Sequence, residues 1–420
     1  MSDPPIRNIV LITVDSLRAD HCGFSGYSRD TSPTLDSMAR NGLNFETAIA
    51  PGPSTTQSMP AVFTGSYPVK RDVSADSSLE ARRAFFRPHM NARDTLPQRL
   101  SRAGYATAGF TPNPYTSRFL GFEQGFDHFE DFIGRSRSSL YDYLFKGFSK
   151  NDSALAMARM GINAIQREEV FKPWEAYYDE ITSWLATAEE PYFLWVHLMD
   201  PHFPFLVDSS YRTQSFLDMY RGNWEFWNTI RNDEALDPAA RDRVITAYDD
   251  SIRYTDDFLE RIKADTADDD PLLIVHGDHG EAFGEHDDYG HGSGLYQEHV
   301  HVPFVVSGAT DKDIQTPVSL ELLPDLIDQL RSGRSVEGAL KPYAFAQTLD
   351  CSLVAVVSDS WKYIRNDDSS ELYDLTQGEE NTIENSEYHE QGQALVDARI
   401  AKYRERLRIA KVAPSISDAS

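Results

Sequence analysis

The sequence predicts an α/β protein in which a central, mostly parallel sheet is flanked by helices. Short apolar runs rich in β-branched residues alternate with amphipathic helical patterns up to about residue 335, which is typical of a doubly wound sheet. Several of these runs end directly in an acidic, amide or imidazole side chain. We expect one large domain over residues 1–338, a small antiparallel sheet with a helix over 339–410, and a loose tail over 411–420.

The strands of the central sheet are predicted from apolar runs that turn residues border. These runs are residues 8–14, 43–49, 105–110, 191–198, 272–275 and 302–306. The first helix is predicted from Ser32-Pro33, a cap followed by a first-turn proline, and from Asn41-Gly42 as its end. Further helices are expected at 96–102 and 320–330, with two or three acidic amphipathic helices between 206 and 263.

Two segments depart from this alternation. Residues 132–186 show a helical pattern with many aromatic side chains, which predicts a helical insertion over the sheet, either packed into the core or acting as a lid. Residues 343–348, 352–357 and 362–365 are typical of short antiparallel strands, and a last helix is expected over about 391–408.

The composition restricts the partners that this chain can have. The 66 acidic residues outnumber the 40 Lys and Arg, which gives a net charge of −26 and argues against a nucleic-acid partner. Such acidity suits either a halophilic protein or an ordinary acidic cytosolic enzyme, and net charge does not separate the two. Two cysteines are too few for a disulfide framework, and no apolar stretch has the roughly 18–20 residues of a membrane span. The first residues lack signal-peptide features, so a soluble, cytoplasmic chain is expected.

Polar side chains follow the apolar runs at the points where parallel strands would end. They are Asp15, Asn113, His202 and the pair Asp278-His279. Sites in open α/β sheets lie at the carboxyl ends of strands, and carboxylates and imidazoles are common ligands of divalent metals. We therefore predict a metal site at this edge, with His202 as a candidate general acid. The alternative is a set of turn caps and hydrogen-bonded surface histidines.

Thr55 is the candidate nucleophile. The segment 51–68 reads as turn residues followed by a short helix, and Thr55 is expected just before the helix N-terminus. Free amides and the positive end of the helix dipole favour an anion there, including an alkoxide or a bound oxyanion. A hydroxyl is a weak nucleophile at neutral pH, so it needs a base or a metal. Taken alone, the residue is more typical of a plain helix cap than of a nucleophile.

Eight motifs follow one another along nearly the whole chain. They are NIVLITVDSLRADHCG, TSPTLDSMARNGLNFETAIAP, the segment from Thr55 ending TGSYP, NPY with GFEQGFD, WVHLMDPHFPF, GDHGEAFGEHDDYGHG, VPFVVSG and ELYDL. Each is weak alone, but in this order the set resembles the sulfatase family of the alkaline phosphatase superfamily. The resemblance implies an alkaline-phosphatase-like fold and leaves the substrate open.

By this resemblance, Asp15, Asp278 and His279 would bind one divalent metal ion. The family's second acid after the first strand is replaced here by Ser16. The loss of a carboxylate weakens the binding of hard cations such as Ca²⁺ or Mg²⁺, and an imidazole ligand suits Mn²⁺ or Zn²⁺ better. The metal is therefore one of these four.

The resemblance also puts Thr55 at the nucleophile position, fixed by its spacing to Thr64-Gly65. Typical sulfatases carry a Cys-x-Pro-Ser-Arg motif there and oxidise its cysteine to formylglycine. Here residues 55–59 read TTQSM, so no formylglycine is expected. Threonine nucleophiles occur in superfamily relatives that cleave phosphodiesters or transfer phosphoglycerol groups, which favours a phosphodiester.

His202 and His291 would act as catalytic groups and Asn113 as a substrate-binding group, by the same resemblance. The expected function is hydrolysis of a sulfate or phosphate ester of a small molecule or glycan, through a covalent intermediate. Transfer of the same group to a glycan or lipid acceptor is the second hypothesis, and a non-catalytic binding protein on this scaffold is the third. Nothing in the sequence indicates an oligomeric state.

Overall fold

The centre of the molecule is an eight-stranded sheet in the order β12-β2-β11-β7-β1-β6-β4-β5. The structure is a computed structural model that describes residues 6–69, 79–132, 172–232, 234–377 and 382–417. In the middle of the sheet, β1 (Ile9–Val14) pairs in parallel with β6 (Tyr192–Leu198) and β7 (Leu272–Gly277). All three strands are buried along their whole length, as expected of parallel strands covered on both faces.

The outer strands complete a mixed, mostly parallel sheet, which confirms the predicted fold class. On the side of β6, β4 (Ala106–Phe110) and β5 (His128–Glu130) continue in parallel. On the side of β7, β11 (Phe304–Ser307) runs antiparallel between β7 and β2 (Leu43–Phe45). The edge strand β12 (Lys312–Ile314) pairs in parallel with β2.

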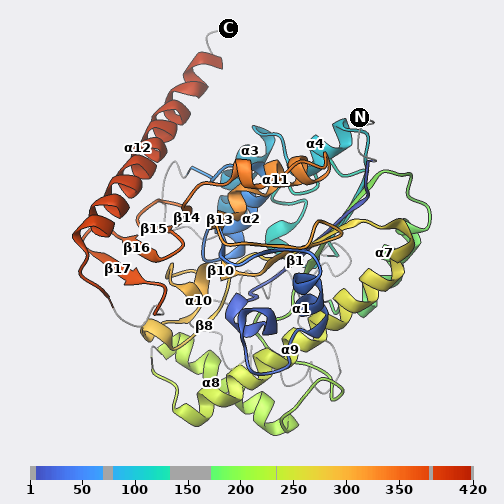
Figure 1. The fold of residues 1–420 in the computed structure, drawn as a ribbon, viewed down its shortest axis with the longest axis horizontal. Helices are drawn as coiled ribbons and strands as arrows, with labels where there is room; N and C mark the ends of the chain where they lie inside the picture. Colours follow the sequence, from blue (N-terminus) through green and yellow to red (C-terminus); the bar gives the residue numbers. More distant parts are fainter. Residues whose placement is uncertain (1–5, 70–78, 133–171, 233, 378–381, 418–420) are drawn as a thin grey trace.

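Helices cover both faces of the sheet (Figure 1). Ile9 and Leu11 face one layer and Val10 and Ile12 the other, because successive strand side chains alternate. The first layer contains α2 (Thr55–Thr64), α3 (Leu79–Asn91), α4 (Leu96–Arg102) and α11 (Leu323–Leu330). The second contains α1 (Pro33–Arg40), α7 (Glu175–Leu185) and α9 (Pro238–Asp265), with α8 (Phe216–Asn232) packed on α9.

Two predicted strands are wrong in their extent. The run 43–49 is broken after β2, and β3 (Ala48–Ile49) instead joins a small sheet between β10 (His301–Val302) and β13 (Val318–Ser319). The run 302–306 is divided at Pro303, which has no N–H to donate to a ladder. Three short elements lie nearby: β8 (Ala282–Phe283), β9 (Tyr289–Gly290) and α10 (Gln297–Val300).

The C-terminal unit is an antiparallel sheet with one long helix. Its strands are β14 (Ala344–Gln347), β15 (Val354–Val357), β16 (Trp361–Arg365) and β17 (Ser370–Asp374). The helix α12 extends over Ser386–Ser417, so the tail expected to be loose from residue 411 is helical to 417. The sequence after 410 contains no glycine that would end a helix. The domain boundary near residue 338 stays a prediction.

The predicted insertion over 132–186 falls largely outside the described residues, because 133–171 are not among them. Its last part, α7, is helical as expected and packs in the second layer. Among the described helices, none combines the length and the hydropathy that crossing a bilayer requires.

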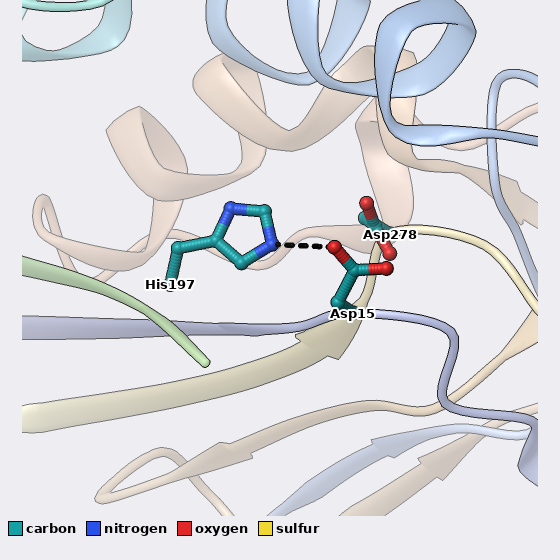
Figure 2. A group of neighbouring side chains, drawn as sticks. All are labelled: Asp15, His197 and Asp278. Carbon is teal, nitrogen blue, oxygen red and sulfur yellow. Dashed lines mark ion pairs between the residues drawn. The ribbon is translucent and has the colours of Figure 1, made fainter. Parts of the chain in front are cut away.

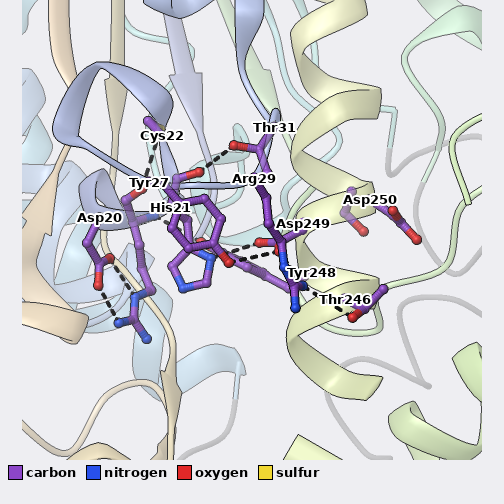
Figure 3. A network of polar contacts seen from close by, with 12 residues as sticks. Asp20, His21, Cys22, Tyr27, Arg29, Thr31, Thr246, Tyr248, Asp249 and Asp250 are labelled. Atoms are coloured by element: carbon purple, nitrogen blue, oxygen red, sulfur yellow. Dashed lines mark hydrogen bonds and ion pairs between the residues drawn. The ribbon is translucent and has the colours of Figure 1, made fainter. Parts of the chain in front are cut away.

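The loop after β1 is anchored on α9 through Asp249, which is 1% exposed (Figure 3). One carboxylate oxygen of Asp249 lies 2.8 Å from Nδ1 of His21, and the other accepts hydrogen bonds from Tyr27 and Arg29 at 2.9 and 2.8 Å. The neighbouring Tyr248 donates to the carbonyl oxygen of Ser16 at 2.7 Å. These contacts fix the backbone that leaves β1 at the edge where the polar strand ends gather.

Candidate active site

Two buried carboxylates lie side by side at the carboxyl end of the central strands. Asp15 directly follows β1 and Asp278 directly follows β7, and both are 0% exposed. The backbone amide of Asp15 bonds to the Leu198 carbonyl and that of Asp278 to the Val14 carbonyl, so the parallel ladder extends to both acids. The amide of Ser16 donates to Asp278 at 3.1 Å. Two acids without water around them favour a compensating cation.

Asp15 is the hub of the cluster. Its Oδ2 accepts a hydrogen bond from Nδ2 of Asn113 at 2.6 Å and lies 3.4 Å from the Thr55 hydroxyl. Its Oδ1 lies 3.4 Å from Nε2 of His279, and that nitrogen lies 3.7 Å from Asp278. The three predicted metal ligands and Thr55 are therefore close neighbours, although up to 264 positions of sequence separate them.

A second imidazole, which the sequence analysis overlooked, belongs to this cluster. His197 lies on β6, and its Nε2 is 3.4 Å from Oδ2 of Asp15 (Figure 2). Ligand atoms of Asp15, His197 and Asp278 all lie within 4.8 Å of one another. Neither Nε2 of His197 nor Oδ2 of Asp278 makes a hydrogen bond to any described residue, although both atoms are buried. Orphaned buried ligand atoms of this kind fit a divalent metal ion.

The orientation of the imidazoles also suits metal binding. Nδ1 of His279 lies 2.8 Å from the Gly280 carbonyl, to which it donates in the neutral ring, and Nδ1 of His197 lies 3.2 Å from the Thr116 hydroxyl. Each contact occupies Nδ1 and turns Nε2 toward the carboxylates. Such partners behind a ligating histidine fix its tautomer and ring orientation. The donor set of two carboxylates and two imidazoles is one that Zn²⁺ and Mn²⁺ accept.

Thr55 is the first residue of α2, and the residue in the capping position is Ser54. Thr55 was expected just before the helix, or alternatively as its cap. Both predictions are wrong by one position, because Ser54 has the extended backbone of a cap. The Thr55 hydroxyl instead points to the cluster, 3.3 Å from Nε2 of His279. The unpaired first amides of a helix and its dipole favour negative charge at this place.

The charges of the cluster depend on one another. Burial alone would raise the pKa of Asp15, but His202, His197 and His279 hold it well below its usual value. Burial, together with the charge of Asp15, raises the pKa of Asp278. Burial disfavours the cation of His279, yet the two carboxylates outweigh it and raise the pKa of His279 to about 10. Without a metal, the cluster therefore holds a proton on His279 as its counter-charge.

Two further predicted residues lie beside the cluster. The rings of His202 and His291 have centroids 5.1 Å apart, and the ring of His291 is 4.6 Å from that of His279. Nδ1 of His202 lies 2.6 Å from the Phe203 carbonyl. Burial lowers the pKa of His202, so its ring is neutral at pH 7 until an anion approaches.

Glu281 is a second residue that the sequence analysis did not assign. Its carboxylate is 1% exposed and lies 3.0 Å from Nδ1 of His291. Burial would raise its pKa, but His291, His202 and His279 lower it, so Glu281 stays ionised and orients His291. The sequence did contain a signal for Glu281, because it lies only four residues after Gly277, the end of β7, close to the acid that follows that strand. For His197 the sequence offered no such signal, because the residue lies inside an apolar strand.

All seven residues chosen from the sequence thus lie in one region of the structure. Comparison with known proteins bears on what this region does. Residues 7–329 match the family model described as Sulfatase. An arylsulfatase of Clostridium perfringens (strain 13 / Type A) is 25% identical over 382 residues, covering 79% of this chain and 76% of its own.

Solved structures share the fold at low identity. A phosphonate monoester hydrolase of Agrobacterium radiobacter superposes with a TM-score of 0.64 at 15% identity, covering 96% of both chains. A protein of the alkaline phosphatase superfamily from Vibrio parahaemolyticus superposes with a TM-score of 0.61 at 16% identity, covering 96% of this chain and 89% of its own. The alkaline-phosphatase-like architecture expected from the sequence is confirmed by these likenesses.

Proposed function

This chain belongs to the sulfatase family, and we propose that it is a metal-dependent hydrolase of sulfate or phosphate esters that uses Thr55 as its nucleophile. One observation carries the proposal: the Thr55 hydroxyl lies 3.4 Å from Asp15 and 3.3 Å from His279, at the N-terminus of α2. A cysteine, and hence formylglycine, is lacking at this position. Among ester substrates we favour a phosphodiester.

Asp15, His197, Asp278 and His279 would hold the metal ion. When bound there, a divalent ion would lower the pKa of the Thr55 hydroxyl and neutralise charge on the ester oxygens. His197 extends the ligand set expected from the sequence. Asn113, which donates to Asp15, keeps that carboxylate oriented, and we propose that it also contacts the substrate.

In the first half-reaction, the Thr55 hydroxyl, its pKa lowered, releases its proton to solvent, and the resulting alkoxide attacks phosphorus or sulfur in line. The bond to Thr55 forms while the bond to the leaving alcohol breaks, and Nε2 of His202 gives the alcohol oxygen its proton. The free amides at the start of α2 donate to the ester oxygens as negative charge collects there. The anionic ester raises the pKa of His202 from its lowered resting value, which supplies the protonated ring that this step needs.

In the second half-reaction, water attacks the group held on Thr55. His202, now neutral, accepts a proton from that water, and the Thr55 oxygen leaves as the alkoxide that began the cycle, so both groups return to their starting protonation states. His291, oriented by Glu281, contacts an oxygen of the transferred group in both steps. An acceptor alcohol in place of water would give group transfer from the same intermediate.

The test is an activity screen of the full chain with matched aryl phosphodiesters, phosphate monoesters and sulfates, each with Mn²⁺, Zn²⁺, Mg²⁺ or Ca²⁺. We expect turnover that a chelator abolishes and metal restores, with diesters turned over fastest. Product formed only when an acceptor alcohol is added would identify a transferase. A protein that takes up no stoichiometric metal and cleaves none of the esters would be a binding protein, and the proposal would be wrong.

A further inference from the structure

One face of α8 is apolar and open to solvent. Four of the six exposed large apolar side chains in the described part of the chain lie on this helix, among them Leu217 at 77%, Trp224 at 49% and Ile230 at 42%. The helix forms one end of the molecule in Figure 1. Residues spaced by three and four share a helix face, so the following side chains form a continuous stripe: Leu217, Tyr220, Trp224, Trp227 and Ile230. Leu217, Trp224 and Ile230 are exposed and Tyr220 and Trp227 are half-buried. An apolar stripe that is open to solvent over most of its length is typical of a binding surface.

The stripe leads to the catalytic histidines. The ring of Trp227 lies parallel to that of Phe203, with centroids 6.1 Å apart, and Phe203 is the neighbour of His202 in the chain. Near the end of the helix, the Ile230 side chain packs against Gly290: a Cβ added to Gly290 would lie 3.4 Å from Cδ1 of Ile230. His291 is the next residue after Gly290. The segments of both histidines therefore rest against α8.

A polar clamp holds this arrangement in place. The side chain of Asn223, on the inner face of α8, accepts a hydrogen bond from the Phe205 amide at 2.8 Å and donates one to its carbonyl at 3.0 Å. Asn223 is 1% exposed, so the clamp is shielded from water. The stripe is thus fixed relative to His202, three residues before Phe205.

We infer that this stripe, defined by Leu217, Tyr220, Trp224, Trp227 and Ile230, binds the apolar alcohol part of the ester, an aryl or alkyl group that leaves toward His202. The inference rests on the proposed function, because it gives the leaving group a place beside its proton donor. Trp227, which stacks on Phe203, and Ile230 form the part nearest the bond that breaks, and the rest of the stripe accommodates a longer chain.

Charge argues against the other occupants of such a face. A net charge of −26 makes a second copy of this chain or an anionic membrane surface a repelled partner. A neutral apolar group meets no such penalty, and each methylene that is fully removed from water tightens binding about fourfold. A highly charged glycan would instead need cationic and hydrogen-bonding side chains along this path.

The test uses the full chain supplied with Mn²⁺ and a series of free alcohols, p-methylphenol to p-hexylphenol, whose binding is measured by titration calorimetry. On a half-open surface we expect the Kd to fall about twofold for each added methylene. Ile230→Ser should remove most of this dependence on chain length. Ile409→Ser is the matched control, since it changes another exposed isoleucine, 61% exposed on α12, and should keep the dependence of the wild type.

Thermal unfolding of the variants checks that each is folded, and Trp224→Ser gives a second reading on the same stripe. A Kd that does not vary with chain length, or an Ile230→Ser protein that behaves as wild type, would overturn the inference. Capture of the wild type by neutral phosphatidylcholine vesicles, without chain-length dependence, would assign the stripe to a membrane surface instead. Because alcohol binding needs no turnover, a protein that binds the series but cleaves no ester would refute the proposed function alone.

Discussion

His197 and Asp15 approach to 3.4 Å because β1 and β6 pair in parallel with Thr13 opposite His197. The register brings the imidazole, one residue before the end of β6, level with the acid that follows β1. Its Nε2 has no hydrogen-bond partner in the described part of the chain. The contact makes a strand histidine part of the candidate metal site.

His197→Ala should weaken metal binding by at least about tenfold, since removal of groups that support a metal site costs ten- to a hundredfold in affinity. The measurement is Mn²⁺ or Zn²⁺ titration of the metal-free protein. His89→Gln is the control, because His89 is also buried but contacts Thr64 away from the cluster. Equal affinities of the wild type and His197→Ala would remove His197 from the ligand set.

Metal binding should release a proton from His279. Its pKa of about 10 in the metal-free protein means that the ring is protonated at neutral pH, whereas a ligand must be neutral. The apparent association constant should therefore rise about tenfold per pH unit as the pH increases toward 10, and level off above it. Calorimetry of metal binding in buffers of different ionisation enthalpy measures the number of protons released per metal ion bound. His279→Asn should lose this slope; a slope equal to that of the wild type would place the proton elsewhere.

His89 should make the fold sensitive to acid. Burial, with Arg93 and Arg406 nearby, lowers its pKa to about 3. The folded pKa lies below the unfolded value of about 6.5, so stability from the neutral ring is complete above 6.5 and is lost as pH falls toward 3. Between pH 6.5 and pH 5 the wild type should lose about 2 kcal/mol more than His89→Gln, which does not titrate. Parallel losses in denaturant titrations of both proteins would contradict this assignment.

Asp249 should be worth far more to stability than its neighbour Asp242, although both bind Arg29. Asp249→Ala leaves Arg29, Tyr27 and His21 without their buried acceptor, at a cost of about 3 kcal/mol in the free energy of unfolding. Asp242 is 70% exposed, and Asp242→Ala should change stability by no more than about 0.5 kcal/mol. Chemical denaturation compares the two, and equal losses would show that Asp249 does not anchor the loop.

Much of the fold could be predicted because its signals are local. The runs that became β1, β6 and β7 are apolar throughout, and their polar ends mark the edge of the sheet. The break at Pro303 was also readable, since proline cannot donate to a ladder. The extent of α12 was not, because helix ends depend on packing as much as on propensity.

The candidate site divides in the same way. Asp15, Asp278 and His279 follow strands and were predicted with Thr55, whereas His197 lies within a strand whose pattern is that of a core. Only the register between β1 and β6 shows that its ring reaches Asp15. Glu281 likewise gained a role only through its contact with His291. That contact depends on how the chain between the two residues turns back through β9, which the sequence does not show. The stripe on α8 could not be predicted, because the sequence does not show which apolar side chains of a helix stay exposed to solvent.

The most direct test of the central claim is the turnover of Thr55→Ala on the best ester of the screen, with its metal affinity measured alongside. We predict that kcat/KM falls by roughly 10⁴-fold or more, as when an active-site nucleophile is removed, while metal affinity stays close to that of the wild type. Thr56→Ala, the adjacent residue of α2, should keep full activity. If Thr55→Ala retains wild-type turnover, the nucleophile lies elsewhere and the mechanism is wrong.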